Sequence, residues 1–324
     1  MNDRSLCLLD NYDIEVLRTW KGRGAILCET NRGILIWKEF SGYKEKVLFQ
    51  DSLLSMIAEK GFLDAESILK NKEGELLSQD VDGTYYILKT YFEGRECNVR
   101  DMEECRQAVK TLAVFHNAAY MEEPLPGVGI SRHACSEFEK HNRELKRVKK
   151  YLKDRGQKTD FELYLMKTYD YFLDLALQTT EEAADLKEGT DKIYVCHGDY
   201  QHHNIILSEG SMRIINFEKC VQDSPVRDLY LFMRKLLEKS SWAEKAGFEL
   251  IEAYEDCRRL EREEYLQLYY RLAYPEKFWK IVNFYYNSGK AWIPGKNLEK
   301  LQKVVEQEKE KQEFLSKFKK SYDL

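Results

Sequence analysis

The sequence is poor in proline and has no apolar stretch long enough to span a membrane. Only 5 of its 324 residues are proline, and 43% are hydrophobic, which argues against long disordered tracts. A secretory signal pattern is absent from the N-terminus. Eight cysteines are scattered without a Cys-x-x-Cys pair, so neither a disulfide framework nor a zinc knuckle is indicated. These absences predict a soluble cytosolic protein with reduced thiols and no membrane partner.

An excess of basic residues is also absent. The formal net charge is −5 at pH 7, and the isoelectric point is near 5.9. Proteins that bind nucleic acid usually carry a basic surface, so nucleic acid is not an expected partner. The length is sufficient for two lobes or domains, each with its own core.

The N-terminal part combines strand patterns with one helix. Two turn signals, Asn-Arg-Gly at residues 31–33 and Asp-Gly at residues 82–83, lie between apolar runs, and each predicts a β-hairpin. Residues 44–60 have helical spacing of apolar side chains, with Gly61 as the expected C-cap. We therefore predict a first lobe over residues 1–92, made of a small antiparallel sheet and one helix.

Beyond residue 92 the pattern becomes helical, which predicts a second, larger lobe over residues 93–324. Amphipathic periodicity predicts helices at 102–119, 137–152, 161–177, 228–239, 243–254, 262–272 and 278–286. Residues 298–319 are rich in lysine and glutamate and have few apolar positions, which predicts a largely solvated helix.

One polar loop interrupts the helical part. Apolar residues 193–196 lead into His197-Gly198-Asp199, and Asn204 follows five residues after the aspartate. A second apolar run and a Ser-Glu-Gly-Ser turn at residues 208–211 come next. This order predicts a loop between short strands with a hairpin behind it. Such loops commonly carry functional side chains because a rigid scaffold holds them in place.

The spacing in this loop resembles the H-G-D-x-x-x-x-N loop of the aminoglycoside-phosphotransferase and choline-kinase group, and the likeness extends to Asp228. Motifs at residues 91–97, 215–220, 225–229 and 274–280 further resemble the CotS family of spore-coat proteins, which shares that fold. The resemblance implies an α+β, bilobal protein-kinase-like fold with a small antiparallel N-lobe and a larger helical C-lobe. It also implies a place in the spore coat, with coat proteins and a small-molecule substrate as partners.

The resemblance assigns roles to residues of the loop. Asp199 matches the catalytic base, Asn204 matches a magnesium ligand, and Asp228 matches the buried acid that braces the loop. His197 is expected to support the loop through hydrogen bonds.

The resemblance also places a nucleotide. Lys38, in the middle of an apolar strand, matches the lysine that contacts the phosphates of ATP; the alternative is an edge-strand lysine pointing to solvent. An ATP-sized cleft is expected near residues 91–94, so Tyr91, Phe92 and Glu93 are predicted nucleotide-binding residues.

The chain departs from this pattern at Asn216, where active kinases of the group have an aspartate that holds magnesium. Magnesium prefers anionic oxygen, so this change is expected to weaken metal-dependent transfer. If the segment is extended, Asn216 and Glu218 face the same side, and Glu218 can supply the missing carboxylate. The alternative is that Glu218 is a surface acid. A second departure is that no glutamate lies in the middle of residues 44–60 to pair with Lys38, where Gln50 and Asp51 are the nearest candidates.

These residues support three hypotheses. The first is a spore-coat pseudokinase that binds nucleotide and has weak or lost phosphotransferase activity. The second is an active kinase that uses ATP and Mg²⁺ to phosphorylate a small-molecule hydroxyl, with Asp199 as base. The third is a metallohydrolase that uses His197, Asp199, His202 and His203 as metal ligands. A second His/Asp cluster, which the third hypothesis requires, is not visible in the sequence.

Overall fold

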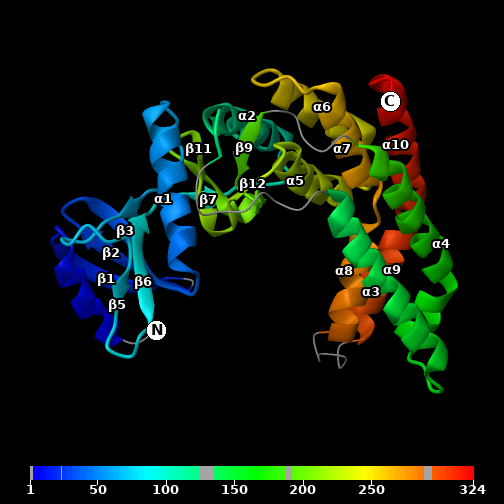
Figure 1. Cartoon of the computed structure of the whole chain (residues 1–324), viewed down its shortest axis with the longest axis horizontal. Helices are drawn as coiled ribbons and strands as arrows, with labels where there is room; N and C mark the ends of the chain where they lie inside the picture. The colour runs from blue at the N-terminus through cyan, green and yellow to red at the C-terminus, as the bar shows by residue number, and fades with distance from the viewer. Residues whose placement is uncertain (1–2, 23, 125–133, 187–191, 288–293) are drawn as a thin grey trace. The chain divides into compact units, whose positions relative to one another are not determined.

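A computed structural model describes residues 3–22, 24–124, 134–186, 192–287 and 294–324 (Figure 1). The chain divides into two compact units. Unit 1 contains Met1–Ile130, Lys192–Leu229 and Asp256–Arg258, and unit 2 contains Ser131–Asp191, Tyr230–Glu255 and Arg259–Leu324. The boundary predicted between residues 92 and 93 lies inside unit 1, and that division into lobes stays a prediction.

The elements follow the mixed pattern that the sequence predicts. The strands are β1 (Val16–Gly22), β2 (Ala25–Thr30), β3 (Gly33–Phe40), β4 (Ile68–Leu69), β5 (Ser78–Gln79), β6 (Tyr85–Thr90), β7 (Arg95–Glu96), β8 (Tyr120–Met121), β9 (Ile193–Cys196), β10 (Ile205–Ser208), β11 (Ser211–Ile214) and β12 (Val221–Gln222). The α-helices are α1 (Lys44–Glu59), α2 (Met102–Ala118), α3 (Ala134–Asp154), α4 (Asp160–Glu182), α5 (Val226–Lys239), α6 (Glu244–Glu255), α7 (Arg262–Ala273), α8 (Glu276–Asn287), α9 (Pro294–Glu306) and α10 (Glu308–Ser321). Short 3-10 helices are η1 (Asp3–Asn11), η2 (Ala183–Asp185), η3 (His202–Asn204) and η4 (Phe217–Lys219).

Unit 1 begins with an antiparallel sheet in the order β1-β2-β3-β6-β4, with β5 also paired to β6. The predicted hairpin between β2 and β3 is confirmed, and its turn uses Gly33 at a φ of +93°, which glycine adopts without strain. Helix α1 ends at Glu59 with Lys60 as its C-cap, and Gly61, predicted as the C-cap, lies one residue further on. The Gly61 and Phe62 amides donate to the carbonyls of Ala58 and Ile57, which caps the helix in a Schellman motif.

The two faces of this sheet have different partners. Helix η1, which the sequence analysis did not predict, packs Leu9 against the face that carries Trp37 and Tyr86, and the two aromatic rings stack. Side chains alternate along a strand, so Lys38 and Lys89, on β3 and β6, extend from the opposite face. This alternation brings two lysines to the same side of the sheet.

Two small sheets complete unit 1 around the polar loop. One has the order β11-β10-β7 and the other β12-β9-β8. The loop leaves β9 and enters β10, and β10 and β11 form the predicted hairpin behind it. Helix α2, capped by Asp101, packs against β9 and β11. The prediction of a loop between short strands is therefore confirmed.

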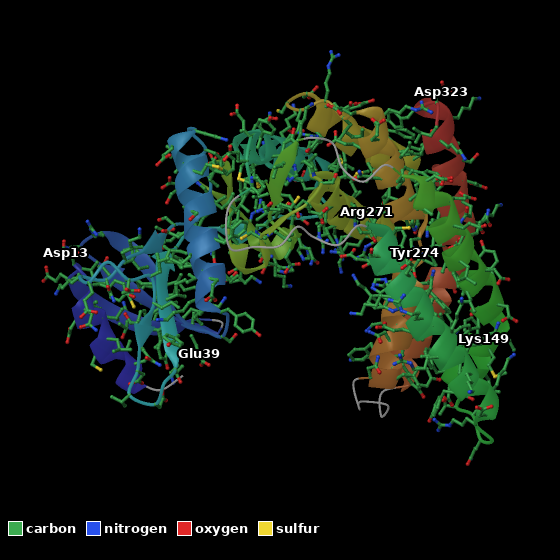
Figure 2. All side chains as sticks on the ribbon, viewed as in Figure 1. Asp13, Glu39, Lys149, Arg271, Tyr274 and Asp323 are labelled. Carbon is green, nitrogen blue, oxygen red and sulfur yellow. The ribbon has the colours of Figure 1, made fainter. Side chains whose placement is uncertain are left out.

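Unit 2 is helical, and α3, α4, α8 and α9 pack around one apolar core. Tyr274 lies among these helices (Figure 2), where its ring stacks on Phe138 and its hydroxyl donates to Asn142 Oδ1 at 2.9 Å. Residues 278–286 form α8, whose buried positions recur at helical spacing. No helix in the described ranges is long and apolar enough to cross a membrane.

The expectation for residues 298–319 was wrong in one respect. These residues form two helices, α9 and α10, and the second buries Phe314, Leu315 and Phe318. Phe314 and Phe318 pack with Phe248 of α6, which explains why a helix rich in lysine and glutamate is held in the core of unit 2.

Candidate functional site

The polar loop, residues 197–204, is anchored by Asp228 at the start of α5. Its fully buried carboxylate accepts hydrogen bonds from the backbone N–H groups of His197 at 2.6 Å and Gly198 at 2.9 Å. His116 Nε2 of α2 lies 3.3 Å from the same carboxylate. Burial would raise the pKa of Asp228, but these hydrogen bonds and the nearby histidines keep it below its usual value. Asp228 therefore contacts the loop backbone directly, and its bracing role stays a prediction.

His197 links the polar loop to Ile215, which directly follows β11. Its Nδ1 accepts from the Asp199 backbone N–H at 3.2 Å, so the neutral ring donates from Nε2 to the Ile215 carbonyl at 2.9 Å. The ring is fully buried against Phe217. One ring nitrogen therefore contacts the loop and the other contacts Ile215, and the supporting role of His197 stays a prediction.

Gly198 brings the polar loop against the η4 turn, Phe217–Lys219. Its φ is +77°, and a Cβ at this position would lie 2.0 Å from the Lys219 carbonyl oxygen. Only glycine fits such an approach, so the backbones of the loop and the turn are in direct contact.

Asp199 lies on the polar loop between two donors. Lys219 Nζ is 2.8 Å from Asp199 Oδ2, and the Gln201 side-chain amide donates to Oδ1. Partial burial tends to raise the pKa of Asp199, but the hydrogen bonds from Lys219 and Gln201 lower it below the usual value. The carboxylate is thus held in its ionised form, as a proton acceptor requires. No sequence pattern indicates these roles of Lys219 and Gln201.

Asn204 and Asn216 hydrogen-bond to each other. Asn204 Nδ2 donates to the Asp199 carbonyl at 2.8 Å, and Asn216 Nδ2 donates to Asn204 Oδ1 at 2.9 Å. Asn216 has the left-handed conformation, with φ 66° and ψ 57°, which asparagine and aspartate tolerate better than most residues. The structure therefore brings the two predicted metal-binding amides together.

The extended segment that would align Asn216 with Glu218 is not formed. Asn216 is left-handed and residues 217–219 form the η4 turn, so strand alternation does not apply here. Glu218 instead meets two lysines, with its Oε1 at 3.0 Å from both Lys38 Nζ and Lys89 Nζ. Burial would raise the pKa of Glu218, but Lys89 and Lys38 lower it to about 2. Glu218 is neither aligned with Asn216 nor a solvated surface acid.

A chain of alternating charges runs from the sheet to the η4 turn. Glu66 Oε1 pairs with Lys89 Nζ at 2.9 Å, Lys89 pairs with Glu218, and Glu218 pairs with Lys38. Glu66 also accepts from the Phe217 backbone N–H at 3.1 Å. The side chain of Lys89 is only 1% exposed, whereas that of Lys38 is 35% exposed. The order Glu66–Lys89–Glu218–Lys38 thus ends in an ammonium group that solvent can reach.

Helix α1 supplies no acid to Lys38. Gln50 is buried and its amide lies 3.3 Å from Glu66 Oε1, while Asp51 pairs with Lys70 at 3.3 Å. Lys38 pairs with Glu218 instead of with an acid on α1. Lys89 and Glu66 were missed, although a lysine within an apolar strand signals a buried acidic partner.

Lys89→Met is expected to destabilise the protein by roughly 3–5 kcal/mol at pH 7, because it removes the buried cation that the buried Glu66 and the half-buried Glu218 share. The pKa of Glu218 is depressed from 4.5 to about 2, so its stabilising effect is complete above pH 4.5 and is lost as the pH falls toward 2. The difference in melting temperature between wild type and Lys89→Met should therefore narrow between pH 7 and pH 3.5.

The matched control is Lys70→Met, which breaks the more exposed pair with Asp51 and should cost less than about 1 kcal/mol. An equal melting-temperature difference between wild type and Lys89→Met at both pH values would contradict the assignment of Lys89 to these acids.

The predicted nucleotide-binding residues follow β6 directly. The Tyr91 N–H donates to the Ile34 carbonyl at 3.3 Å, and the Arg213 guanidinium lies 5.4 Å from the centre of the Phe92 ring. Glu93 is exposed. A Cβ at Gly94 would lie 2.2 Å from the Leu207 carbonyl oxygen, so this segment passes close to β10. Tyr91, Phe92 and Glu93 thus lie in unit 1 with the polar loop, and their role toward a nucleotide stays a prediction.

The chain matches a known family along nearly its whole length. A family model described as "Spore coat putative kinase YutH" matches residues 6–318. The chain belongs to this spore-coat kinase family. Spore coat protein S of Bacillus subtilis (strain 168) is 24% identical over 322 residues, which cover 93% of this chain and 88% of that protein. The predicted CotS resemblance is confirmed.

Solved structures similar to this member of the spore-coat kinase family are phosphotransferases. The aminoglycoside phosphotransferase from Alicyclobacillus acidocaldarius subsp. acidocaldarius DSM 446 has a TM-score of 0.86 at 18% identity, with 98% of this chain and 96% of that chain covered. Spectinomycin phosphotransferase APH(9)-Ia, in complex with ADP and spectinomycin, has a TM-score of 0.66 at 15% identity, with 94% of each chain covered. At these identities the likeness shows the fold, and it confirms the kinase-like fold class.

In this member of the spore-coat kinase family, the residues predicted to bind magnesium do not fit a divalent cation. Asn204 and Asn216 are neutral, and the Asn204 oxygen accepts the Asn216 amide. Glu218 carries the negative charge of this set, and Lys38 and Lys89 neutralise it. Magnesium binds hard anionic oxygen best, so this set lacks its preferred ligand.

The metallohydrolase hypothesis also lacks a ligand set in the described ranges. His197 uses both ring nitrogens in hydrogen bonds to the backbone of Asp199 and Ile215. In that part of the chain the group of three side chains close enough to share a metal is His116, Cys196 and Asp228. All three are buried, and Asp228 is occupied by the backbone amides of the loop. The cluster does not include Asp199, His202 or His203.

Proposed function

We propose that this protein is a nucleotide-binding component of the spore coat in which phosphotransferase activity is weak or lost. The family and the B. subtilis relative support the spore-coat location. The phosphotransferase fold and the exposed end of Lys38 support nucleotide binding, with ATP as the ligand class. The observation that carries the loss of activity is Asn216, whose amide group bonds to Asn204 where active kinases need a carboxylate.

The second candidate is an active ATP-dependent kinase of a small-molecule hydroxyl. It is favoured by Asp199, whose ionised carboxylate could accept the proton of a hydroxyl group, and by Asp228, which braces the loop. The two candidates differ in the expected rate of phosphoryl transfer from ATP by the wild-type protein, which is low for the first and high for the second.

Asn216→Asp is expected to raise phosphate release from ATP at least about tenfold in the presence of Mg²⁺, because it restores an anionic ligand. The left-handed backbone at Asn216 accommodates aspartate, so the variant should keep its fold. The gain should disappear in the double variant Asn216→Asp/Asp199→Ala, which removes the base. Phosphate release measured with and without EDTA tests both statements.

The matched control is Asn98→Asp, which adds the same charge at an exposed residue whose side-chain oxygen accepts from the Arg100 N–H. A wild-type rate that is already high and falls with Asp199→Ala would favour the active kinase. An unchanged rate in Asn216→Asp would contradict the role of Asn216.

A further inference from the structure

The acid of the polar loop, Asp199, and the acid of the η4 turn, Glu218, are both paired with lysines. Asp199 meets Lys219 at 2.8 Å, and Glu218 meets Lys38 and Lys89 at 3.0 Å. With Glu66, these ion pairs contain three acids and three lysines, whose charges balance, while Asp228 is bound by backbone N–H groups of the loop. A cluster of this composition has no excess negative charge to attract a divalent cation.

The side-chain amides of Asn204 and Asn216 are likewise paired within the chain. Asn216 donates to the Asn204 oxygen, so each satisfies the other without an ion. Asn204 is buried, and its own amide donates to the Asp199 backbone carbonyl. The place where the fold would hold magnesium is therefore closed by hydrogen bonds within the chain.

Lys219 is the lysine that contacts Asp199, the predicted catalytic base. Its side chain is 65% exposed, whereas that of its partner Asp199 is 18% exposed. Its backbone is fixed, because the Lys219 carbonyl oxygen is in close contact with Gly198. Lys38 reaches the same turn from β3, through Glu218. An ammonium group has three N–H donors, so it can hold a carboxylate and a phosphate oxygen at once.

We infer that this site binds the polyphosphate of a nucleotide without a divalent cation, and that Lys219, together with Lys38, supplies the positive charge. The inference rests on the proposed function, because it requires that a nucleotide binds. Lys219 thereby becomes a phosphate-binding residue that also pairs with Asp199.

Calorimetric titration of the full chain with ATP, in EDTA and in excess Mg²⁺, tests the inference. The Kd in EDTA is expected to lie within threefold of the Kd in Mg²⁺. Lys219→Gln is expected to raise the Kd in EDTA about tenfold, and Lys219→Arg, which keeps the charge, should restore most of the affinity. Asn216→Asp should make binding at least about tenfold tighter in Mg²⁺ than in EDTA, because it adds an anionic ligand.

Lys309→Gln is the control for charge, since Lys309 lies on α10 with a side chain that is 83% exposed. It should leave the Kd within twofold of wild type. ATP binding that requires Mg²⁺ in the wild type would overturn the inference and leave the proposed function standing. Equal effects of Lys219→Gln and Lys309→Gln would overturn the role of Lys219. Absence of ATP binding under both conditions would refute the proposed function itself.

Discussion

Gly198→Ala is expected to destabilise the protein by about 3–5 kcal/mol and to abolish nucleotide binding. The new Cβ would lie 2.0 Å from the Lys219 carbonyl oxygen, so the polar loop and the η4 turn must separate. Alanine at a φ of +77° adds strain of about 1–2 kcal/mol. Thermal unfolding and ATP titration measure the two effects.

Gly210→Ala separates the steric effect from the strain. Gly210 has a φ of +82°, but a Cβ there meets no atom within 4 Å. Its substitution should cost only about 1–2 kcal/mol, the strain of the left-handed backbone, and should leave ATP binding unchanged. Equal losses in the two variants would show that the contact between loop and turn is unimportant.

Asp228→Asn is expected to cost about 3–5 kcal/mol in the free energy of unfolding. The carboxylate is fully buried and accepts from two backbone N–H groups of the polar loop, and the amide would direct N–H donors toward other donors. Thermal or urea unfolding measures the loss. Because the loop is then released, ATP binding should weaken together with stability.

Asp101→Asn is the matched control for Asp228→Asn. Asp101 also accepts from two backbone N–H groups, those of Glu103 and Glu104, but it is an exposed N-cap of α2. Asparagine caps helices about as well as aspartate, so this variant should stay within about 0.5 kcal/mol of wild type. Similar losses in the free energy of unfolding at Asp101 and Asp228 would contradict the inference that Asp228 holds the polar loop in place.

Periodic features of the sequence were sufficient to predict most elements. The hairpin around Gly33, the end of α1 near Gly61 and the aromatic helix α8 all follow from local spacing and from residues with special backbone preferences. The polar loop was found in the same way, because apolar strands flank it. These elements could be predicted because residues close together in the sequence determine them.

The conformation at Asn216 was missed for a different reason. Residues 211–214 form a strand, and the same alternation was extended to Glu218. A single left-handed residue ends the strand and redirects Glu218 toward the sheet. Asparagine is a weak signal for such a turn, because it occurs in many other conformations.

Lys89 and Glu66 lie 23 residues apart in the sequence, and Glu218 is 129 residues from Lys89. Pairing over such distances depends on the fold and cannot be deduced from spacing. The burial of α10 was missed likewise, because its few apolar residues are enough once Phe248 provides a surface for them.

The pairing of Lys38 with Glu218 has a consequence for control of the site. In protein kinases the strand lysine pairs with a helical glutamate, so displacement of that helix breaks the pair and turns the enzyme off. Here α1 contributes Gln50, which contacts Glu66, and the acid for Lys38 comes from the η4 turn. The acid that pairs with Lys38 thus does not lie on α1. Displacement of α1 therefore cannot separate Lys38 from a helical acid in the way that it does in protein kinases.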